Sequence, residues 1–222
     1  MVDVQKAAVV AILTRAPSSG GKTRLFSALG CPPDPDLLTA LFLDTFDAAC
    51  VTGVMRVVCY EPASAGPEIR ALVGDEVPLL AQRGDDLGER MRNAFEDLLG
   101  SGAATVVLIG SDLPLLDSGA IAEAHAVLRS RPEAVVLGPA TDGGYYLIGA
   151  TRVPQVLFGG IRWGTNSVLQ ETERKAHDAG VEVHRVAEMS DVDTPYELRR
   201  VAASSGPRGQ RTRHLIARLG LH

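Results

Sequence analysis

The chain has 222 residues, of which 45% are hydrophobic, so it is long enough to bury one sizeable core. Its net charge of −5 and its pI near 5.5 argue against general nucleic-acid binding, because a protein that follows phosphates carries a basic face. Three cysteines, Cys31, Cys50 and Cys59, form no C-x-x-C pair, and no apolar segment is long enough to cross a bilayer. We therefore expect a cytoplasmic protein without a membrane span.

Apolar runs rich in valine, isoleucine and leucine alternate along the chain with segments of helical periodicity. We expect strands at 7–13, 54–60, 77–81, 105–109, 134–137, 145–148 and 181–186, and helices at 36–51, 86–99, 118–128 and 166–179. This alternation is typical of a mostly parallel sheet that is covered by helices. The sequence therefore predicts a three-layer α/β/α sandwich with a mostly parallel mixed sheet, whose site lies at the carboxyl ends of the strands.

No long linker divides the chain, and a Ser-Ser-Gly-Pro break starts at residue 204. We predict a single domain over 1–203 and a basic tail or short docking helix over 204–222. The tail contains four arginines and no acidic residue. Because no aromatic residues are interleaved with them, these arginines are a weak signal for nucleic acid, and we do not expect nucleic acid as a partner.

The expected strand at 7–13 leads into a loop that contains both glycines and cations. Glycine backbone exposes N–H groups to phosphate oxygens, and the cations offset the phosphate charge. A solvated basic loop is the alternative interpretation. The candidate phosphate-binding residues are Arg15, Gly20, Gly21, Lys22 and Arg24.

The same loop also resembles a P-loop, because Gly21-Lys22-Thr23 has the required ending. However, Ala16 stands where the first glycine belongs. The next helix would also be shorter than a P-loop crossover helix, since Gly30 follows after about two turns. We keep this interpretation as a minority alternative.

Candidate metal ligands follow two of the expected strands. Asp112 comes shortly after the strand at 105–109 and is the first choice, because Mg²⁺ prefers oxygen donors and often uses only one or two protein carboxylates. Asp191 and Asp193 stand two residues apart, before a helix with Thr194 as N-cap. We expect the turn into this helix to break the strand-like alternation, so we select Asp193 and hold Asp191 in reserve. Helix capping is the alternative role for Asp112 and Asp193.

The segment 138–149 places Asp142 beside Gly143 and Gly144, which allow the backbone to approach a bulky ligand closely. An ordinary glycine-rich hairpin turn is the alternative. We also expect Trp163 to line an acceptor pocket and Arg90 to reach a bound anion, although Trp163 is equally compatible with core packing.

Six motifs follow one another along the chain: Lys22-Thr23-Arg24-Leu25, Asp86-Leu87-Gly88-Glu89-Arg90-Met91, Gly110-Ser111-Asp112-Leu113-Pro114, 138–149, Trp163-Gly164-Thr165 and Asp191-Val192-Asp193-Thr194-Pro195. Together they resemble the bacterial glycosyltransferase-like family labelled radical-SAM/selenodomain-associated transferase, of the nucleotide-diphospho-sugar transferase superfamily. The resemblance covers about residues 7 to 200. It extends more distantly to guanylyltransferases that act on 2-phospholactate or phosphoenolpyruvate.

This resemblance implies a glycosyltransferase-A fold. It also implies that Lys22 and Arg24 touch the nucleotide phosphates, that Asp112 and Asp193 hold Mg²⁺ (or Mn²⁺), and that Asp142 faces the acceptor or sugar. The chain departs from the family pattern in two places: Arg15 stands where lysine is usual, and the loop 17–22 is one residue short.

We therefore predict a Mg²⁺-dependent transferase with a nucleotide-activated donor and a small-molecule acceptor. Glycosyl transfer from a nucleotide-diphospho-sugar is favoured, with Asp142 and Lys22 as catalytic residues. The alternative is nucleotidyl transfer from a nucleoside triphosphate to a phosphorylated small molecule, with release of pyrophosphate. A P-loop NTPase and a non-catalytic nucleotide-binding protein are the remaining alternatives. The donor base, the acceptor and the oligomeric state stay open.

Overall fold

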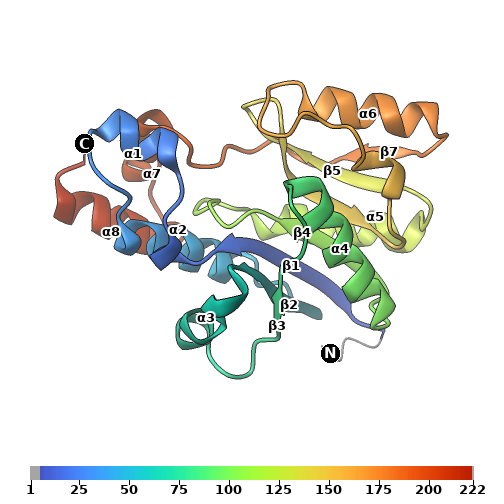
Figure 1. Cartoon of the computed structure of the whole chain (residues 1–222), viewed down its shortest axis with the longest axis horizontal. Helices are drawn as coiled ribbons and strands as arrows, with labels where there is room; N and C mark the ends of the chain where they lie inside the picture. Colours follow the sequence, from blue (N-terminus) through green and yellow to red (C-terminus); the bar gives the residue numbers. More distant parts are fainter. Residues whose placement is uncertain (1–5, 222) are drawn as a thin grey trace.

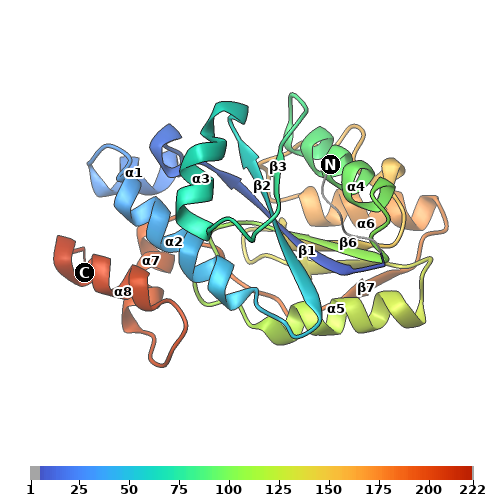
Figure 2. The same ribbon diagram turned by 90° about the horizontal axis from the view of Figure 1, so that it is seen from below.

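The computed structural model describes residues 6–221 and contains one mixed sheet of seven strands. The strand order is β3-β2-β1-β4-β6-β5-β7, and β6 runs antiparallel to both of its neighbours while the other pairs are parallel. Figures 1 and 2 show this twisted sheet between two layers of helices. The strands are β1 (Ala8–Arg15), β2 (Val54–Glu61), β3 (Leu79–Ala81), β4 (Thr105–Ile109), β5 (Val135–Pro139), β6 (Tyr145–Ala150) and β7 (Val183–Arg185).

Two groups of helices cover the two faces of the sheet, and a third group packs beside it. Helices α2, α3 and α5 lie on one face, α4 and α6 on the other, and α1, α7 and α8 gather at one end of the molecule (Figure 2). The helices are α1 (Thr23–Leu29), α2 (Pro35–Ala48), α3 (Gly66–Val73), α4 (Leu87–Gly100), α5 (Ser118–Ser130), α6 (Val168–Asp178), α7 (Pro195–Ala203) and α8 (Gln210–Leu219).

The central strand β1 shows why this sequence forms a buried sheet. Val10 and Ile12 pack with the α2, α3 and α5 layer, whereas Val9 and Ala11 pack with the α4 and α6 layer. All four side chains are buried, because alternate residues of a strand point to opposite faces and both faces are covered. The predicted three-layer α/β sandwich is confirmed.

The C-terminal helix α8 is attached to α2 by a buried carboxylate. Asp44 of α2 is 5% exposed, and its oxygens accept hydrogen bonds from the backbone N–H groups of Arg211 and Thr212 and from the Thr212 hydroxyl. Leu215 and Ile216 are buried with residues of α1, α2 and α7. The Arg211 guanidinium pairs with Asp44 and Asp47, so part of the basic charge of α8 is used within the chain.

Among the helices of residues 6–221, none has the length and the apolar character that crossing a membrane requires.

Candidate functional site

Three aspartates meet where the carboxyl end of β4 approaches the segment that follows β7. The backbone N–H of Val192 donates to the carbonyl oxygen of Asp112 at 3.0 Å, and this bond aligns the two segments. Val192 is 1% exposed and packs into the core. Asp191 and Asp193, on either side of it, place carboxylate oxygens within 4.8 Å of each other and of Asp112.

The expectation that the turn would separate Asp191 from Asp193 is therefore wrong. The strand-like alternation persists through this segment, because Val192 occupies the buried position and its two neighbours face the site. Helix α7 begins with a capping box formed by Thr194 and Glu197, so Asp193 is not its cap.

Asp112 does not cap a helix either. Asp117 is the N-cap of α5, and its carboxylate accepts the N–H of Gly119 at 3.0 Å. The Asp112 carboxylate therefore has no capping role and lies beside the other two aspartates of the site.

Lys22 lies among these three carboxylates. Its Nζ contacts Asp112 and is 2.5 Å from Oδ1 of Asp193 and 3.9 Å from Oδ2 of Asp191. The backbone of Lys22 is left-handed, with φ 48°, and Gly20 and Gly21 before it also have positive φ. This loop conformation directs the ammonium group toward the aspartates.

Charge and burial set the protonation of Asp191. Burial raises the pKa of its carboxyl, the nearby charges of Asp193 and Asp142 raise the pKa further, and Lys22 opposes both effects. The cluster thus concentrates negative charge that a cation must balance.

The three carboxylates fit a divalent cation of the Mg²⁺ or Mn²⁺ type. Each offers a hard oxygen donor, these oxygens converge, and Mg²⁺ takes only a few protein carboxylates and completes its coordination with phosphate and water. Asp112 and Asp193 are two of the three residues of this cluster, and Asp191 is the third.

Two cavities meet at this cluster, and both are lined by Ser111 and Asp112. The glycine-loop cavity has a volume of about 330 Å³ and is lined in addition by Thr14, Arg15, Gly20, Gly21, Lys22, Thr23, Leu38 and Leu41. The tryptophan cavity has a volume of about 300 Å³, and its lining includes Leu13, Leu87, Met91, Asp142, Gly144, Tyr145, Trp163 and Asp191.

Asp142 reaches the tryptophan cavity from the hairpin between β5 and β6. Its Oδ1 accepts the N–H of Gly144 at 2.9 Å. Gly143 has φ 89°, and a Cβ atom built on it would lie 2.2 Å from the carbonyl oxygen of Asn166. The close backbone approach that this glycine permits is therefore to the loop that carries Trp163, not to a ligand as we expected.

The loop around Trp163 is held by Glu171 of α6. This carboxylate accepts hydrogen bonds from the Ser167 hydroxyl and from the Arg162 guanidinium, and these bonds lower the pKa of Glu171 to about 2. The indole of Trp163 rests on Gly88 at the start of α4, where a built Cβ atom would lie 2.6 Å from Cζ2. Trp163 is thus a wall of the cavity and also packs against core residues.

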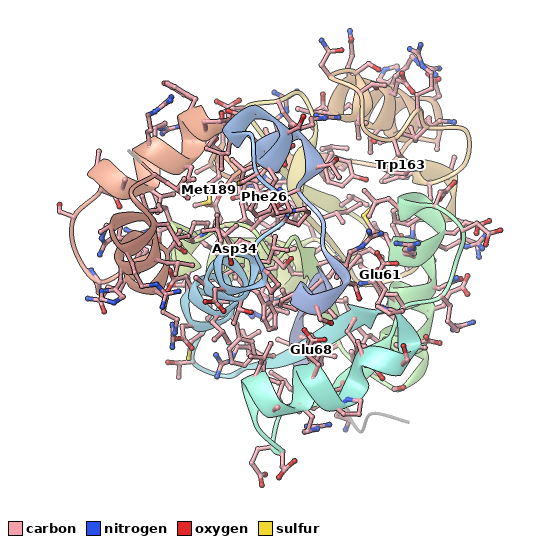
Figure 3. The ribbon with its side chains drawn as sticks, turned by 60° about the vertical axis from the view of Figure 1, so that its left-hand side comes forward. Phe26, Asp34, Glu61, Glu68, Trp163 and Met189 are labelled. Atoms are coloured by element: carbon pink, nitrogen blue, oxygen red, sulfur yellow. The ribbon has the colours of Figure 1, made fainter. Side chains whose placement is uncertain are left out.

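Arg15 and Arg90 lie together at the end of β2, where both guanidinium groups pair with Glu61. In Figure 3, Glu61 at the end of β2 and Trp163 in the loop before α6 lie on the same, right-hand side of the molecule. Arg15 also lines the glycine-loop cavity. Arg90 donates to the carbonyl of Gly84 and lines neither cavity, and its expected contact with a bound anion stays a prediction.

Arg24 bridges two parts of the site. Its guanidinium is 3.8 Å from Oδ2 of Asp193 and donates to the carbonyl oxygen of Gly164 at 3.3 Å. It thereby links α1 to the loop that carries Trp163. It lies outside the residues that line the glycine-loop cavity.

The fold and the arrangement of the site agree with solved structures of nucleotide-diphospho-sugar transferase type. A protein of Desulfovibrio desulfuricans G20, provisionally assigned as a nucleotide-diphospho-sugar transferase, is 31% identical, with a TM-score of 0.82 over 96% of each chain. A CMP:2-keto-3-deoxy-manno-octonic acid synthetase, solved with CTP, shares the fold with a TM-score of 0.56 and 16% identity over 96% of this chain and 99% of that chain. A cytidylyltransferase of Leptospira borgpetersenii shares it with a TM-score of 0.51 and 12% identity over 97% and 95% of the two chains.

The 31% identity to the Desulfovibrio protein places the chain in the nucleotide-diphospho-sugar transferase superfamily, as a transferase, and the other two structures share its fold. Residues 45–165 match the family DUF2064, described as uncharacterized proteins conserved in bacteria, and the chain belongs to this family. No curated protein matches it significantly. These comparisons do not distinguish subtypes within the superfamily, so the radical-SAM-associated subtype stays a prediction. The shared fold gives no support to the P-loop alternative.

Proposed function

We propose that the protein transfers a glycosyl group from a nucleotide-diphospho-sugar to a small acceptor, with Mg²⁺ or Mn²⁺ bound. The observation that carries this proposal is the meeting of the two cavities at Asp112. One cavity is lined by glycine backbone and cations, and the other by carboxylates and an indole. A diphosphate that joins a nucleoside to a sugar would pass from one cavity to the other at this point.

The glycine-loop cavity suits the diphosphate. Arg15 and Lys22 supply positive charge to its lining, and Gly20 and Gly21 bring backbone close to the cavity. Asp112, Asp191 and Asp193 would hold the metal ion, which when bound stabilises negative charge on phosphate oxygens.

Lys22 would act at the boundary between the metal and the phosphates. Its ammonium group now contacts the carboxylates, and it is on the lining of the glycine-loop cavity. A cation there stabilises the charge that develops on the leaving diphosphate.

Asp142 is the candidate general base. In an inverting transfer, the acceptor hydroxyl gives its proton to the Asp142 carboxylate while its oxygen forms a bond to the anomeric carbon. The bond from that carbon to the diphosphate oxygen breaks, and the electron pair leaves with the nucleoside diphosphate. The position of Asp142 on the tryptophan cavity, next to the aspartate cluster, supports this role.

Calorimetric titration tests the proposal. Nucleotide-sugars, nucleoside diphosphates and nucleoside triphosphates are titrated into the protein with and without Mg²⁺. We expect a nucleotide-sugar to bind more tightly than the triphosphate of the same base, and Asp112→Asn to remove the Mg²⁺-dependent part while the variant stays folded. Preference for a triphosphate would favour nucleotidyl transfer instead, and unchanged binding by Asp112→Asn would contradict the metal assignment.

A further inference from the structure

The tryptophan cavity combines apolar walls with charge of one sign. The described residues that line it include three carboxylates, Asp112, Asp142 and Asp191, but no lysine or arginine. Leu13, Leu87 and Met91 supply apolar surface to its lining. A ligand group that enters this cavity therefore meets negative charge and apolar surface together.

Two cations that contact residues of the cavity lining are already engaged. Lys22 pairs with Asp112 and Asp193, and Arg24 bonds to the carbonyl oxygen of Gly164 at the edge of the cavity. The Arg24 side chain is 68% exposed, so solvent screens its charge. Asp112 and Asp191 belong to the cluster that Lys22 or a metal balances, which leaves Asp142 to set the charge that an incoming group meets.

Trp163 gives the cavity a fixed aromatic wall. The indole lies against Gly88, where there is no room for a Cβ atom, and its ring is perpendicular to that of Tyr145, at 83° with 6.4 Å between centroids. Contacts on these two sides hold the indole in one orientation. A rigid aromatic surface with one nearby carboxylate suits a ring that has both C–H faces and hydroxyl groups.

We infer that the tryptophan cavity selects a hydroxylated ring that is neutral or positively charged, such as a hexose or an amino sugar. It rejects the same ring when the ring carries a carboxylate or a phosphate. Asp142 sets this charge preference and Trp163 supplies the packing surface. The inference rests on the proposed function for the route by which the ring arrives, as the glycosyl group of the donor or as a free acceptor.

Electrostatic repulsion determines how much more weakly an acidic ring is expected to bind than a neutral one. An acidic ring would place a negative charge beside Asp142 in a cavity whose lining residues offer no basic partner. Between the dielectric of water and that of a protein surface, such a contact between like charges weakens binding by about tenfold. A cavity volume near 300 Å³ is at the lower end for small-molecule sites, which favours a single ring over an oligosaccharide.

The chain contains a single tryptophan, so tryptophan fluorescence reports directly on this cavity. In one arm, methyl glucoside, methyl glucosaminide and methyl glucuronide are titrated into the full-length protein. In the second arm, UDP-glucose, UDP-glucuronate and UDP are titrated with Mg²⁺. Tighter binding of UDP-glucose than of UDP in the second arm indicates that the ring enters as part of the donor.

We expect the neutral and amino sugars to bind about tenfold more tightly than the glucuronides in whichever arm responds. Asp142→Asn should bring this ratio close to one. Asp75→Asn is the matched control, because it removes one carboxylate that is 93% exposed and away from the cavity, and it should leave the ratio unchanged.

Equal or tighter binding of the glucuronides would overturn the inference, as would an unchanged ratio in Asp142→Asn or the absence of a ring-dependent signal in both arms. A preference for neutral rings in the first arm, with no binding of UDP or its sugars, would support the inference and count against a uridine donor. Gly88→Ala gives a second test: it should displace the indole and weaken ring binding without changing the affinity for UDP, and equal ring affinity would refute the role of Trp163.

Discussion

Lys22→Met replaces the ammonium group that lies among the three aspartates with an uncharged side chain of similar length. The backbone of Lys22 is left-handed in the native protein, and methionine has the same backbone restriction as lysine, so the substitution changes charge more than backbone strain. Without the ammonium, the carboxyl groups of Asp112, Asp191 and Asp193 still lie within 4.8 Å of one another but have lost this counter-ion.

The solvent exposure of Lys22 and its aspartate partners determines how much stability the substitution removes. The side chains of Lys22, Asp112 and Asp193 are 16%, 20% and 29% exposed, so the ion pairs lie between the buried and the surface limits. Loss of one partner costs about 3–5 kcal/mol for a buried pair and about 0–1 kcal/mol for a surface pair. We expect a loss of about 2 kcal/mol in the free energy of unfolding, or about 4–8 °C in Tm for a domain of this size.

Urea unfolding and thermal scans measure this loss, and titration with Mn²⁺ measures its recovery. A divalent cation at one hundred times its Kd should restore about 2.7 kcal/mol, and Lys22→Met should bind Mn²⁺ more tightly than the native protein because no ammonium competes for the carboxylates. Arg24→Met is the matched control, with an expected change below about 0.5 kcal/mol, since Arg24 is 68% exposed and 3.8 Å from Asp193. Native stability in Lys22→Met, or equal Mn²⁺ affinity in the two proteins, would refute this reasoning.

Three further predictions concern stability. Gly143→Ala should lower the free energy of unfolding by more than about 2 kcal/mol, because the new Cβ atom would lie 2.2 Å from the Asn166 carbonyl oxygen. Gly53→Ala is the control in urea unfolding, since Gly53 has a similar positive φ but open space around it. Equal losses in the two variants would contradict the predicted clash. Asp44→Ala should destabilise the protein by about 2–4 kcal/mol and expose α8 to limited proteolysis, and an intact α8 would contradict this role. Burial lowers the pKa of His125 to about 4, so between pH 4 and the ordinary value of 6.5 the unfolded chain binds a proton that the native protein does not. The contribution of neutral His125 to the free energy of unfolding should be fully present above pH 6.5 and fall by about 3 kcal/mol as the pH approaches 4. In urea titrations, His125→Gln should make the free energy of unfolding less dependent on pH in this range. The same pH dependence in the native protein and the variant would contradict this prediction.

The sequence predicted the sheet well, because buried strands leave a strong pattern. The strand at 105–109 has the predicted bounds, and the other predicted strands lie within a few residues of those in the structure. Helix α3 was not predicted, since it has only eight residues and begins with Gly66-Pro67. The hairpin interpretation of 138–149 indicated that β5 and β6 run antiparallel, whereas the pairing of β6 with β4 joins strands that are distant in sequence and was not predicted.

The sequence identified most residues of the candidate site, but it did not predict which of them contact each other. Asp112 and Asp193 lie in one cluster, and Asp142 and Trp163 line one cavity, because loops at the carboxyl ends of strands converge. The place of Asp191 could have been read from the Asp-Val-Asp alternation, in which the buried Val192 is the signal. The pairing of Arg90 with Glu61 and the contact of Gly143 with Asn166 join residues that are distant in sequence, and a single sequence does not show such contacts.

The central claim is that Asp112, Asp191 and Asp193 bind a divalent cation beside the diphosphate of a nucleotide. Crystals soaked with MnCl₂ and a nucleoside diphosphate, with diffraction recorded at a wavelength where manganese scatters anomalously, test it most directly. We expect an anomalous peak among these three carboxylates, with diphosphate density in the glycine-loop cavity. Nucleotide density elsewhere on the molecule, or a nucleotide bound in that cavity without manganese at the aspartates, would contradict it.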